Sequence, residues 1–188
     1  MPQRNKIIER LAEELDKERF DHSLRVEQTA LKLAKRYGVA ARQVSLAALL
    51  HDCARRYDRP GLLRQARKHG IVVDAVSRAE PKLLHAELSA ILAKKEFGIR
   101  DKRVLNAIRR HTIGAPAMSR LEQVIYLADH LEEGRQFRGV NDLRRLVKKD
   151  LNKAMVGSTT NMLEFLLKQG LPIHPGTIAT RNYYLMRS

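Results

Sequence analysis

Cysteine and long apolar runs are what this sequence has least of. Cys53 is the one cysteine among 188 residues. A single cysteine excludes an intramolecular disulfide and any zinc site made of several cysteines, and it fits a reducing cytoplasm. No apolar run approaches the length of a membrane span, and the N-terminal residues are too charged for a signal peptide. These absences predict a cytoplasmic protein that does not contact a membrane.

Glycine and proline are also scarce, with 10 and 6 residues, and hydrophobic residues make up 44% of the chain. This composition excludes a low-complexity or disordered chain and is typical of a compact globular protein. Apolar residues recur with a helical period in nearly every segment, as in "NKIIERLAEELDK" near the N-terminus, and no segment alternates like a strand. We therefore predict an all-α fold. We expect a single domain over residues 1–188, with a core at roughly 18–135 on which helices at 141–188 pack.

Several helix boundaries can be placed from local signals. Ser119, with Glu122 three residues later, predicts a capping box at the start of a helix. A third helix is expected at roughly 41–56. The last third is expected to hold two helical segments broken near Gly157, followed by a proline-containing loop at 171–182, "LPIHPGTIATRN".

The formal net charge is +15, which raises the question of a nucleic-acid partner. The positive residues are spread along the chain, and there is no basic tail or arginine-rich run. Such a diffuse field suits any polyanionic partner, including a small phosphorylated substrate. A solvated basic surface without a partner explains it equally well.

Histidines and aspartates stand on the apolar faces or at the ends of separate predicted helices. A lone histidine in such a place is usually a core residue with a hydrogen-bond partner, and burying a polar group without a partner is costly. One divalent cation would satisfy four such groups together if the faces converge, and imidazole and carboxylate ligands suit zinc, iron, manganese and related metals. The residues in question are His22, His51, Asp52, His85, His111 and Asp129.

The order of these residues resembles that of a known family. The pattern of His22, then His51 and Asp52, then Asp129 is similar to the H…HD…D pattern of the HD-domain metal-dependent phosphohydrolases. The closer resemblance is to the YqeK family, which hydrolyses diadenosine tetraphosphate symmetrically to two ADP. The stretches that carry it span nearly the whole chain: "RFDHSLRV" (19–26), "LAALLHDCAR" (46–55), "PKLLHAELSA" (81–90), "VLNAIRRHTIG" (104–114), "LEQVIYLADHLEEGRQFRGV" (121–140) and "HPGTIATRNYYL" (174–185).

The resemblance implies an HD-domain helical bundle with a metal held by His22, His51, Asp52 and Asp129. The metal is expected to be iron, with manganese or another first-row metal as the alternative, and with one or two ions. Metal ions help phosphate chemistry because they lower the pKa of bound water and neutralise phosphate oxygens. The implied reaction is hydrolysis of a dinucleoside tetraphosphate by a metal-activated water.

The resemblance also implies that Arg19, His85, His111, Thr112 and Arg135 face the phosphates of the nucleotide. Arginine offers a planar, charged fork that matches phosphate. Histidine titrates near neutral pH, so His85 or His111 could stabilise or protonate the leaving phosphate; either could instead bind a second metal. The expected catalytic residues are His85, His111 and Asp52. Asp52 is also one of the predicted metal ligands.

Three positions depart from the family pattern. His130 and Cys53 stand where the family often has an aromatic residue, and Arg138 replaces what is often a proline. His130 could compete as a metal ligand, but one step along a helix turns a side chain by ~100°, so we expect it to point away from the metal. Cys53 is expected to be a buried small side chain.

Two other functions remain open. The first is an HD phosphohydrolase that acts on another nucleotide, such as a guanosine polyphosphate or a deoxynucleotide. The second is an RNA- or ribosome-associated binding module on an HD scaffold, which would bind RNA in a salt-sensitive manner. The sequence does not fix the oligomeric state, and a homodimer is one alternative.

Overall fold

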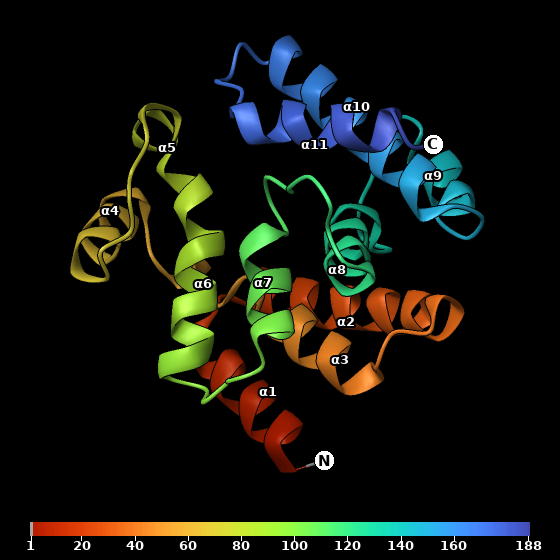
Figure 1. Ribbon diagram of the computed structural model, residues 1–188. Coiled ribbons are helices and arrows are strands. Elements are labelled where there is room, and N and C mark those ends of the chain that lie inside the picture. Colours follow the sequence, from red (N-terminus) through yellow and green to blue (C-terminus); the bar gives the residue numbers. More distant parts are fainter. Residues whose placement is uncertain (1) are drawn as a thin grey trace.

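The computed structural model describes residues 2–188, and in this part of the chain every regular element is a helix, as the sequence predicts (Figure 1). Two of the elements are short 3-10 helices, named η. The elements are, in chain order, α1 (Pro2–Glu14), α2 (Lys17–Tyr37), α3 (Ala41–Leu50), η1 (Cys53–Arg56), α4 (Arg59–Lys68), α5 (Ala75–Ala79), η2 (Pro81–Leu83), α6 (Leu84–Lys95), α7 (Lys102–Arg110), α8 (Arg120–Leu131), α9 (Val140–Leu146), α10 (Leu151–Lys168) and α11 (Pro175–Leu185).

Helix α3 lies at the centre of the hydrophobic core. Leu49 and Leu50 are fully buried, and most of the other side chains of α3 are buried too. Each fully buried leucine stabilises the fold by roughly 2 kcal/mol. Helices α2, α7 and α8 pack against α3. The C-terminal ends of α3 and α7 therefore come close to the middle of α2 and to α8.

Helix α3 ends sooner than the sequence predicts. The expected helix at 41–56 stops at Leu50, and η1 follows after a two-residue break. The break is at His51 and Asp52, where Asp52 has φ −109° and ψ 13°. Because these dihedral angles lie outside the helical region, the chain changes direction there. The break directs both side chains into the interior, where they are buried.

The expected break near Gly157 is also wrong. α10 runs through Gly157 without interruption, and the chain turns before it, between α9 and α10. Gly157 is in a helix interior because α9 packs closely against it. A Cβ atom at this position would lie 2.5 Å from Cδ2 of Leu143. The glycine thus marks a close approach of two helices and not a break.

The segment at 171–182 is a loop only over residues 171–174, because α11 begins at Pro175. His174 caps the N-terminus of α11, accepting a hydrogen bond from the backbone N–H of Gly176 at 3.0 Å, and Pro175 occupies the first helical position. Proline is well suited to that position because its missing N–H would have no partner in the helix. Pro172 precedes α11 and Pro175 begins it, so most of this segment is helical and not the predicted loop.

The helices α10 and α11 lie side by side at the end of the molecule opposite α1 (Figure 1). Buried Tyr184 of α11 joins them to the rest of the fold, because its hydroxyl accepts a hydrogen bond from the Met118 N–H at 2.9 Å. Thr180 adds a bond from its hydroxyl to the Ile113 carbonyl at 3.3 Å. The C-terminal helices are therefore attached directly above the loop that follows α7.

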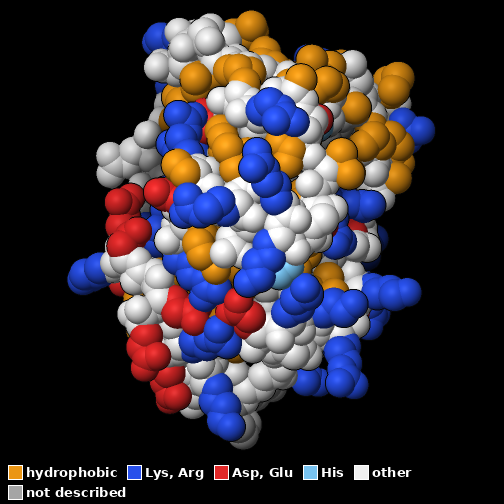
Figure 2. All heavy atoms as spheres, turned by 90° about the vertical axis from the view of Figure 1, so that its left-hand side faces the viewer, with side chains coloured by type: hydrophobic (Ala, Val, Ile, Leu, Met, Phe, Trp, Pro, Cys, Tyr) orange, Lys and Arg blue, Asp and Glu red, His pale blue; other side chains and the backbone are white. Residues whose placement is uncertain are grey.

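The surface is basic without a concentrated patch on the face seen in Figure 2, where lysine and arginine side chains are spread from top to bottom. Hydrophobic side chains gather towards the end where α10 and α11 lie. Among the described helices, none is both long and apolar enough to cross a membrane.

Candidate metal centre

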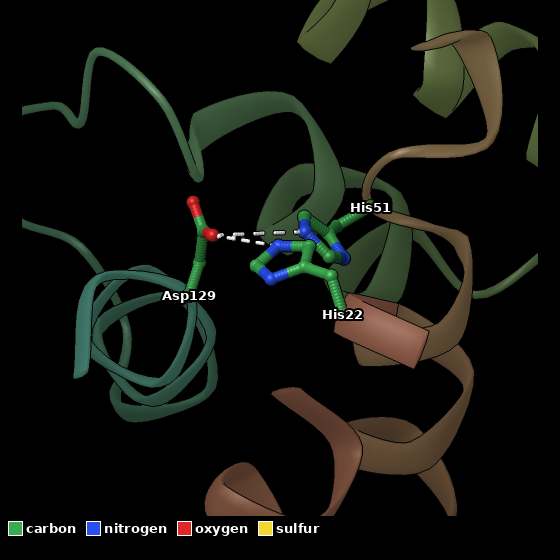
Figure 3. A group of neighbouring side chains, drawn as sticks. All are labelled: His22, His51 and Asp129. Carbon is green, nitrogen blue, oxygen red and sulfur yellow. Dashed lines mark ion pairs between the residues drawn. The ribbon is translucent and has the colours of Figure 1, made fainter. Parts of the chain in front are cut away.

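Polar side chains from three helices and the segment after one of them meet beside the break after α3. His22 comes from the middle of α2, His51 and Asp52 from the end of α3, and Asp129 from α8. Figure 3 shows the Asp129 carboxylate facing the rings of His22 and His51. The distance from Asp129 Oδ1 is 3.0 Å to His22 Nε2 and 3.9 Å to His51 Nε2. Asp52 Oδ2 lies 3.8 Å from His51 Nε2 and 4.0 Å from His22 Nε2.

Each of these two histidines has its Nδ1 atom occupied by an acceptor. His51 Nδ1 donates to the Ala48 carbonyl at 2.6 Å, and His22 Nδ1 donates to Glu132 Oε1 at 3.3 Å. A proton on Nδ1 leaves the lone pair of a neutral imidazole on Nε2. Complete burial lowers the pKa of His51 to about 4, so its ring is neutral at pH 7. Both Nε2 lone pairs thus point into the cluster.

These lone pairs have no hydrogen-bond partner. His22 Nε2 and His51 Nε2 are buried and unpartnered. Burial opposes ionisation of Asp129, but the neighbouring His22, together with His51 and Arg135, holds its pKa well below the usual range. The site therefore brings buried nitrogen lone pairs close to a carboxylate with nothing to bridge them. A cation is the partner that this arrangement lacks, and the residues present fit a divalent metal ion.

Asp52 faces two groups of residues at once. Its Oδ2 atom lies towards His22 and His51, whereas its Oδ1 atom lies 3.1 Å from His85 Nε2 and 3.6 Å from His111 Nε2. Burial opposes ionisation of Asp52, but the neighbouring His51, His111 and His85 hold its pKa well below the usual range. Ligand atoms of His51, Asp52 and His111 lie within 4.8 Å of one another, as do those of His22, His51 and Asp129.

His85 and His111 form a pair on the far side of Asp52. Their Nε2 atoms are 3.0 Å apart, and the Thr112 hydroxyl lies 3.1 Å and 2.9 Å from them. Both Nδ1 atoms face backbone carbonyls, of Lys82 and Ile108. Two lone pairs at this distance repel, so the pair favours a proton between them. Burial opposes that proton on His111, but the nearby Asp52 carboxylate outweighs burial and raises the His111 pKa. Burial lowers the His85 pKa.

The predicted phosphate-binding arginines lie at the edge of the cluster. Arg19 Nη1 is 3.4 Å from Asp52 Oδ2, and its side chain is 30% exposed. Arg135 donates to Asp129 Oδ1 at 2.7 Å and is 40% exposed. A third arginine, Arg55, reaches Asp52 Oδ2 at 3.9 Å. The sequence reading did not single out Arg55, although its position three residues after Asp52 was the available signal.

Glu132 is a second residue that the sequence reading missed. It is 2% exposed and lies behind His22, where it also accepts a bond from Arg25 Nε at 2.6 Å and one from the Gly134 N–H at 2.6 Å. Burial opposes ionisation of Glu132, but Arg25 and the other two donors lower its pKa. Gly134 makes room for this pair, because a Cβ atom there would lie 2.7 Å from Arg25 Nε. The position of Glu132 three residues after Asp129 was the only signal of this role in the sequence.

The positions that depart from the family pattern stand apart from the cluster. His130 Nε2 donates to Asn161 Oδ1 of α10 at 3.2 Å, so the ring turns away from Asp129 as expected. Cys53 is buried, and burial raises the pKa of its thiol to about 12, which keeps it protonated. Arg138 is exposed in the segment between α8 and α9.

Comparison with known proteins agrees with this arrangement. Residues 19–134 match the HD domain family. The chain is 40% identical to the symmetrical bis(5'-nucleosyl)-tetraphosphatase of Halalkalibacterium halodurans, over 97% of each chain. It is 34% identical to the symmetrical bis(5'-nucleosyl)-tetraphosphatase of Bacillus subtilis, over 98% of this chain and 99% of that protein.

A solved structure extends the comparison to the fold. The crystal structure of a predicted HD superfamily hydrolase involved in NAD metabolism from Clostridium acetobutylicum superposes with a TM-score of 0.94. It shares 40% sequence identity and covers 98% of this chain and 97% of its own. The chain therefore belongs to the HD domain family and, within it, to the family of the symmetrical bis(5'-nucleosyl)-tetraphosphatases.

Proposed function

We propose that this protein hydrolyses dinucleoside tetraphosphates and cleaves diadenosine tetraphosphate between its two central phosphates to give two ADP. The names of its full-length relatives support the substrate class. The observation that carries the proposal is the pair of buried, unpartnered Nε2 atoms of His22 and His51, which lie close to Asp129 and Asp52.

His22, His51, Asp52 and Asp129 would hold a divalent metal ion, the cofactor that an HD domain implies. The ion would lower the pKa of water and neutralise phosphate oxygens, which is the chemistry that phosphoanhydride hydrolysis needs. We propose iron as the native metal, with manganese as the alternative. His51, Asp52 and His111 form a second group of possible ligands, which would hold a second ion if two are bound.

The arginines at the edge of the site would bind the phosphate chain. Arg19 and Arg135 are in contact with Asp52 and Asp129, and both are partly exposed. Their guanidinium groups can therefore contact a polyphosphate at the site entrance without leaving the carboxylates. This contact would place the central phosphates next to the cluster.

His85, His111 and Thr112 would act on the leaving phosphate. Hydrolysis forms a bond from a water oxygen to one central phosphorus and breaks the bond to the bridging oxygen, which leaves on ADP with the bonding electrons. The proton shared at His85 and His111 is the one available to that oxygen, and Asp52 stabilises the protonated pair. The Thr112 hydroxyl orients the pair by its bonds to both Nε2 atoms.

We also propose where the protein acts and what it binds. We propose a cytoplasmic protein whose partner is a nucleotide; a homodimer remains open. The lysines and arginines are spread along the chain without a basic tail or an arginine-rich run, which favours a small anionic substrate over a long nucleic acid.

Product analysis tests the reaction. The purified protein, loaded with iron, manganese or cobalt, is incubated with diadenosine tetraphosphate and the products are separated by ion-exchange chromatography. ADP as the sole product is expected. ATP with AMP would contradict symmetrical cleavage, and no turnover with any metal would contradict this substrate. A parallel panel of guanosine polyphosphates and deoxynucleotides tests the alternative substrates.

A binding assay tests the RNA alternative. An RNA-binding module would keep tight, salt-sensitive RNA binding in His51→Ala and Asp52→Ala variants. The enzyme proposal predicts that these variants lose turnover, and that the wild-type protein has no tight RNA binding at physiological salt.

A further inference from the structure

A cavity of about 700 Å³ opens next to the cluster, on the Asp129 side. Its walls are the segment between α8 and α9 and one face of α10. Asp129 and Arg135 belong to both the cluster and the cavity, and no other cavity residue has a role in the proposed reaction. The volume is that of a typical pocket for a small organic ligand.

Aromatic rings line this cavity. The rings of His130 and Phe137 lie with centroids 4.8 Å apart and planes tilted by 43°. Phe165 of α10 also lines the cavity, and 52% of its surface is exposed. A phenylalanine exposed to water would gain contacts from a flat ligand. Nucleobases have flat π faces that stack on aromatic side chains.

Several polar groups of the cavity suit the rest of a nucleotide, and the exposed Glu164 carboxylate is the one lining group that would repel phosphate besides Asp129. Asn161 Oδ1 accepts the bond from His130, so the Asn161 amide nitrogen keeps its two donors for a ligand. Arg138 and Lys168 also line the cavity, and within residues 2–188 no carboxylate lies within 4.0 Å of either one. Two positive charges without ion-pair partners, beside aromatic rings, are complementary to phosphates that carry a base.

We propose that this cavity binds one of the two nucleosides of the substrate, with the base against Phe137 and Phe165 and the adjoining phosphates near Arg138 and Lys168. This inference rests on the proposed function, because a substrate with a nucleoside at each end that is cut in its middle needs space on two sides of the cluster. The cavity provides that space on the Asp129 side, and His85 and His111 lie on the other side of Asp52.

Surface substitutions on α10 test the inference. Phe165→Ala is expected to raise the KM for diadenosine tetraphosphate by about tenfold, the effect of losing one base-stacking contact, with little change in kcat. Lys168→Gln is expected to raise KM and to weaken its dependence on salt. Leu167→Ala and Lys149→Gln are matched controls, since both residues are exposed and outside the cavity. The fold of each variant is checked by thermal denaturation.

Two ligands separate recognition of the nucleoside from recognition of phosphate. ADP binding to the metal-loaded protein is measured by calorimetry, and inorganic tripolyphosphate is measured as a competitive inhibitor. The inference predicts that Phe165→Ala weakens ADP binding and leaves inhibition by tripolyphosphate unchanged. It is overturned if both ligands lose affinity equally, if the KM and ADP affinity of this variant stay within about twofold of the Leu167→Ala control, or if the wild-type protein does not bind ADP. Failure of the proposed function looks different: ADP binds in the cavity as predicted, but diadenosine tetraphosphate is not cleaved.

Discussion

The two sides of Asp52 contain similar residues in different states. On one side, His22 and His51 point bare Nε2 lone pairs at Asp129 and lack hydrogen-bond partners. On the other side, His85 and His111 contact each other, Asp52 and Thr112. Both sides are buried, and the histidines on both sides have their Nδ1 atoms occupied. The main difference lies in the groups that the Nε2 atoms face.

That difference indicates two kinds of chemistry in one cluster. Lone pairs without a proton are what a metal ion needs, whereas two nitrogens that share a carboxylate and a hydroxyl suit a proton. Asp52 links the two sides because each of its oxygens faces one of them. Substitutions on the two sides should therefore fail in different ways.

The largest effect is expected for His51→Ala. Removing this ligand should abolish metal binding and reduce turnover by more than about 10⁴-fold, comparable with loss of a catalytic group. Metal content by mass spectrometry and product chromatography measure the two effects. His69→Ala, which removes a histidine outside the cluster, should change neither. A His51→Ala protein that retains metal would remove the distinction between the two sides.

His111→Gln should lower kcat by roughly 10²- to 10³-fold, the usual contribution of a positioned acid or base. Metal content should equal that of the wild type, because His111 lies on the protonated side. Steady-state kinetics and metal analysis of the same preparation give both values. If this variant loses its metal as His51→Ala does, the two sides form one ligand set and a second ion belongs in the site.

Glu132→Gln should weaken metal affinity by about 10- to 100-fold, the usual cost of losing a partner that orients a metal-binding histidine. The amide keeps the shape of the side chain but no longer attracts the Nδ1 proton of His22 with a full charge. Competition with a fluorescent chelator measures the affinity. The exposed neighbour offers a control, Glu133→Gln, for which wild-type affinity is expected. Equal affinities in the two variants would contradict this role of Glu132.

The smallest effect is expected for Ser119→Ala at the start of α8. Loss of the capping box, in which Ser119 Oγ accepts from the Glu122 N–H, should lower the free energy of unfolding by about 1 kcal/mol. Urea denaturation measures this change. Metal content and kcat should stay at wild-type levels, which would separate general stability from the contrast between the two sides. A loss of metal here would mean that stability alone governs the site.

The residues of the cluster were predictable from sequence because they occur in a fixed order within recognisable short motifs. The pattern relates positions as far apart as His22 and Asp129, and the structure places them 3.0 Å apart. The capping box at Ser119 was predictable for a similar reason, since it depends on four consecutive residues. The roles assigned to the cluster residues stay predictions until the variants are measured.

Other features depend on contacts that no local pattern reveals. Glu132 and Arg25 are 107 positions apart, and their pairing requires α2 to lie against the end of α8. Gly157 is typical of a helix break, but here its missing side chain leaves space for Leu143 of α9. The cavity next to Asp129 depends on the path of α10, which the sequence predicts to be broken near Gly157. In each case the packing of helices decides what the residue does.

The tautomers of the four histidines also bear on how the site assembles. Three of the rings donate their Nδ1 proton to the carbonyl three residues earlier, so the correct nitrogen is free as soon as that short piece of chain folds. His22 is the exception, because its proton acceptor is Glu132, 110 positions away. Its lone pair is oriented only once α2 has docked against α8. An ion that binds His22 together with Asp129 therefore favours the arrangement in which α2 is docked on α8. By mass action, the ion stabilises the contact between two segments that are distant in sequence.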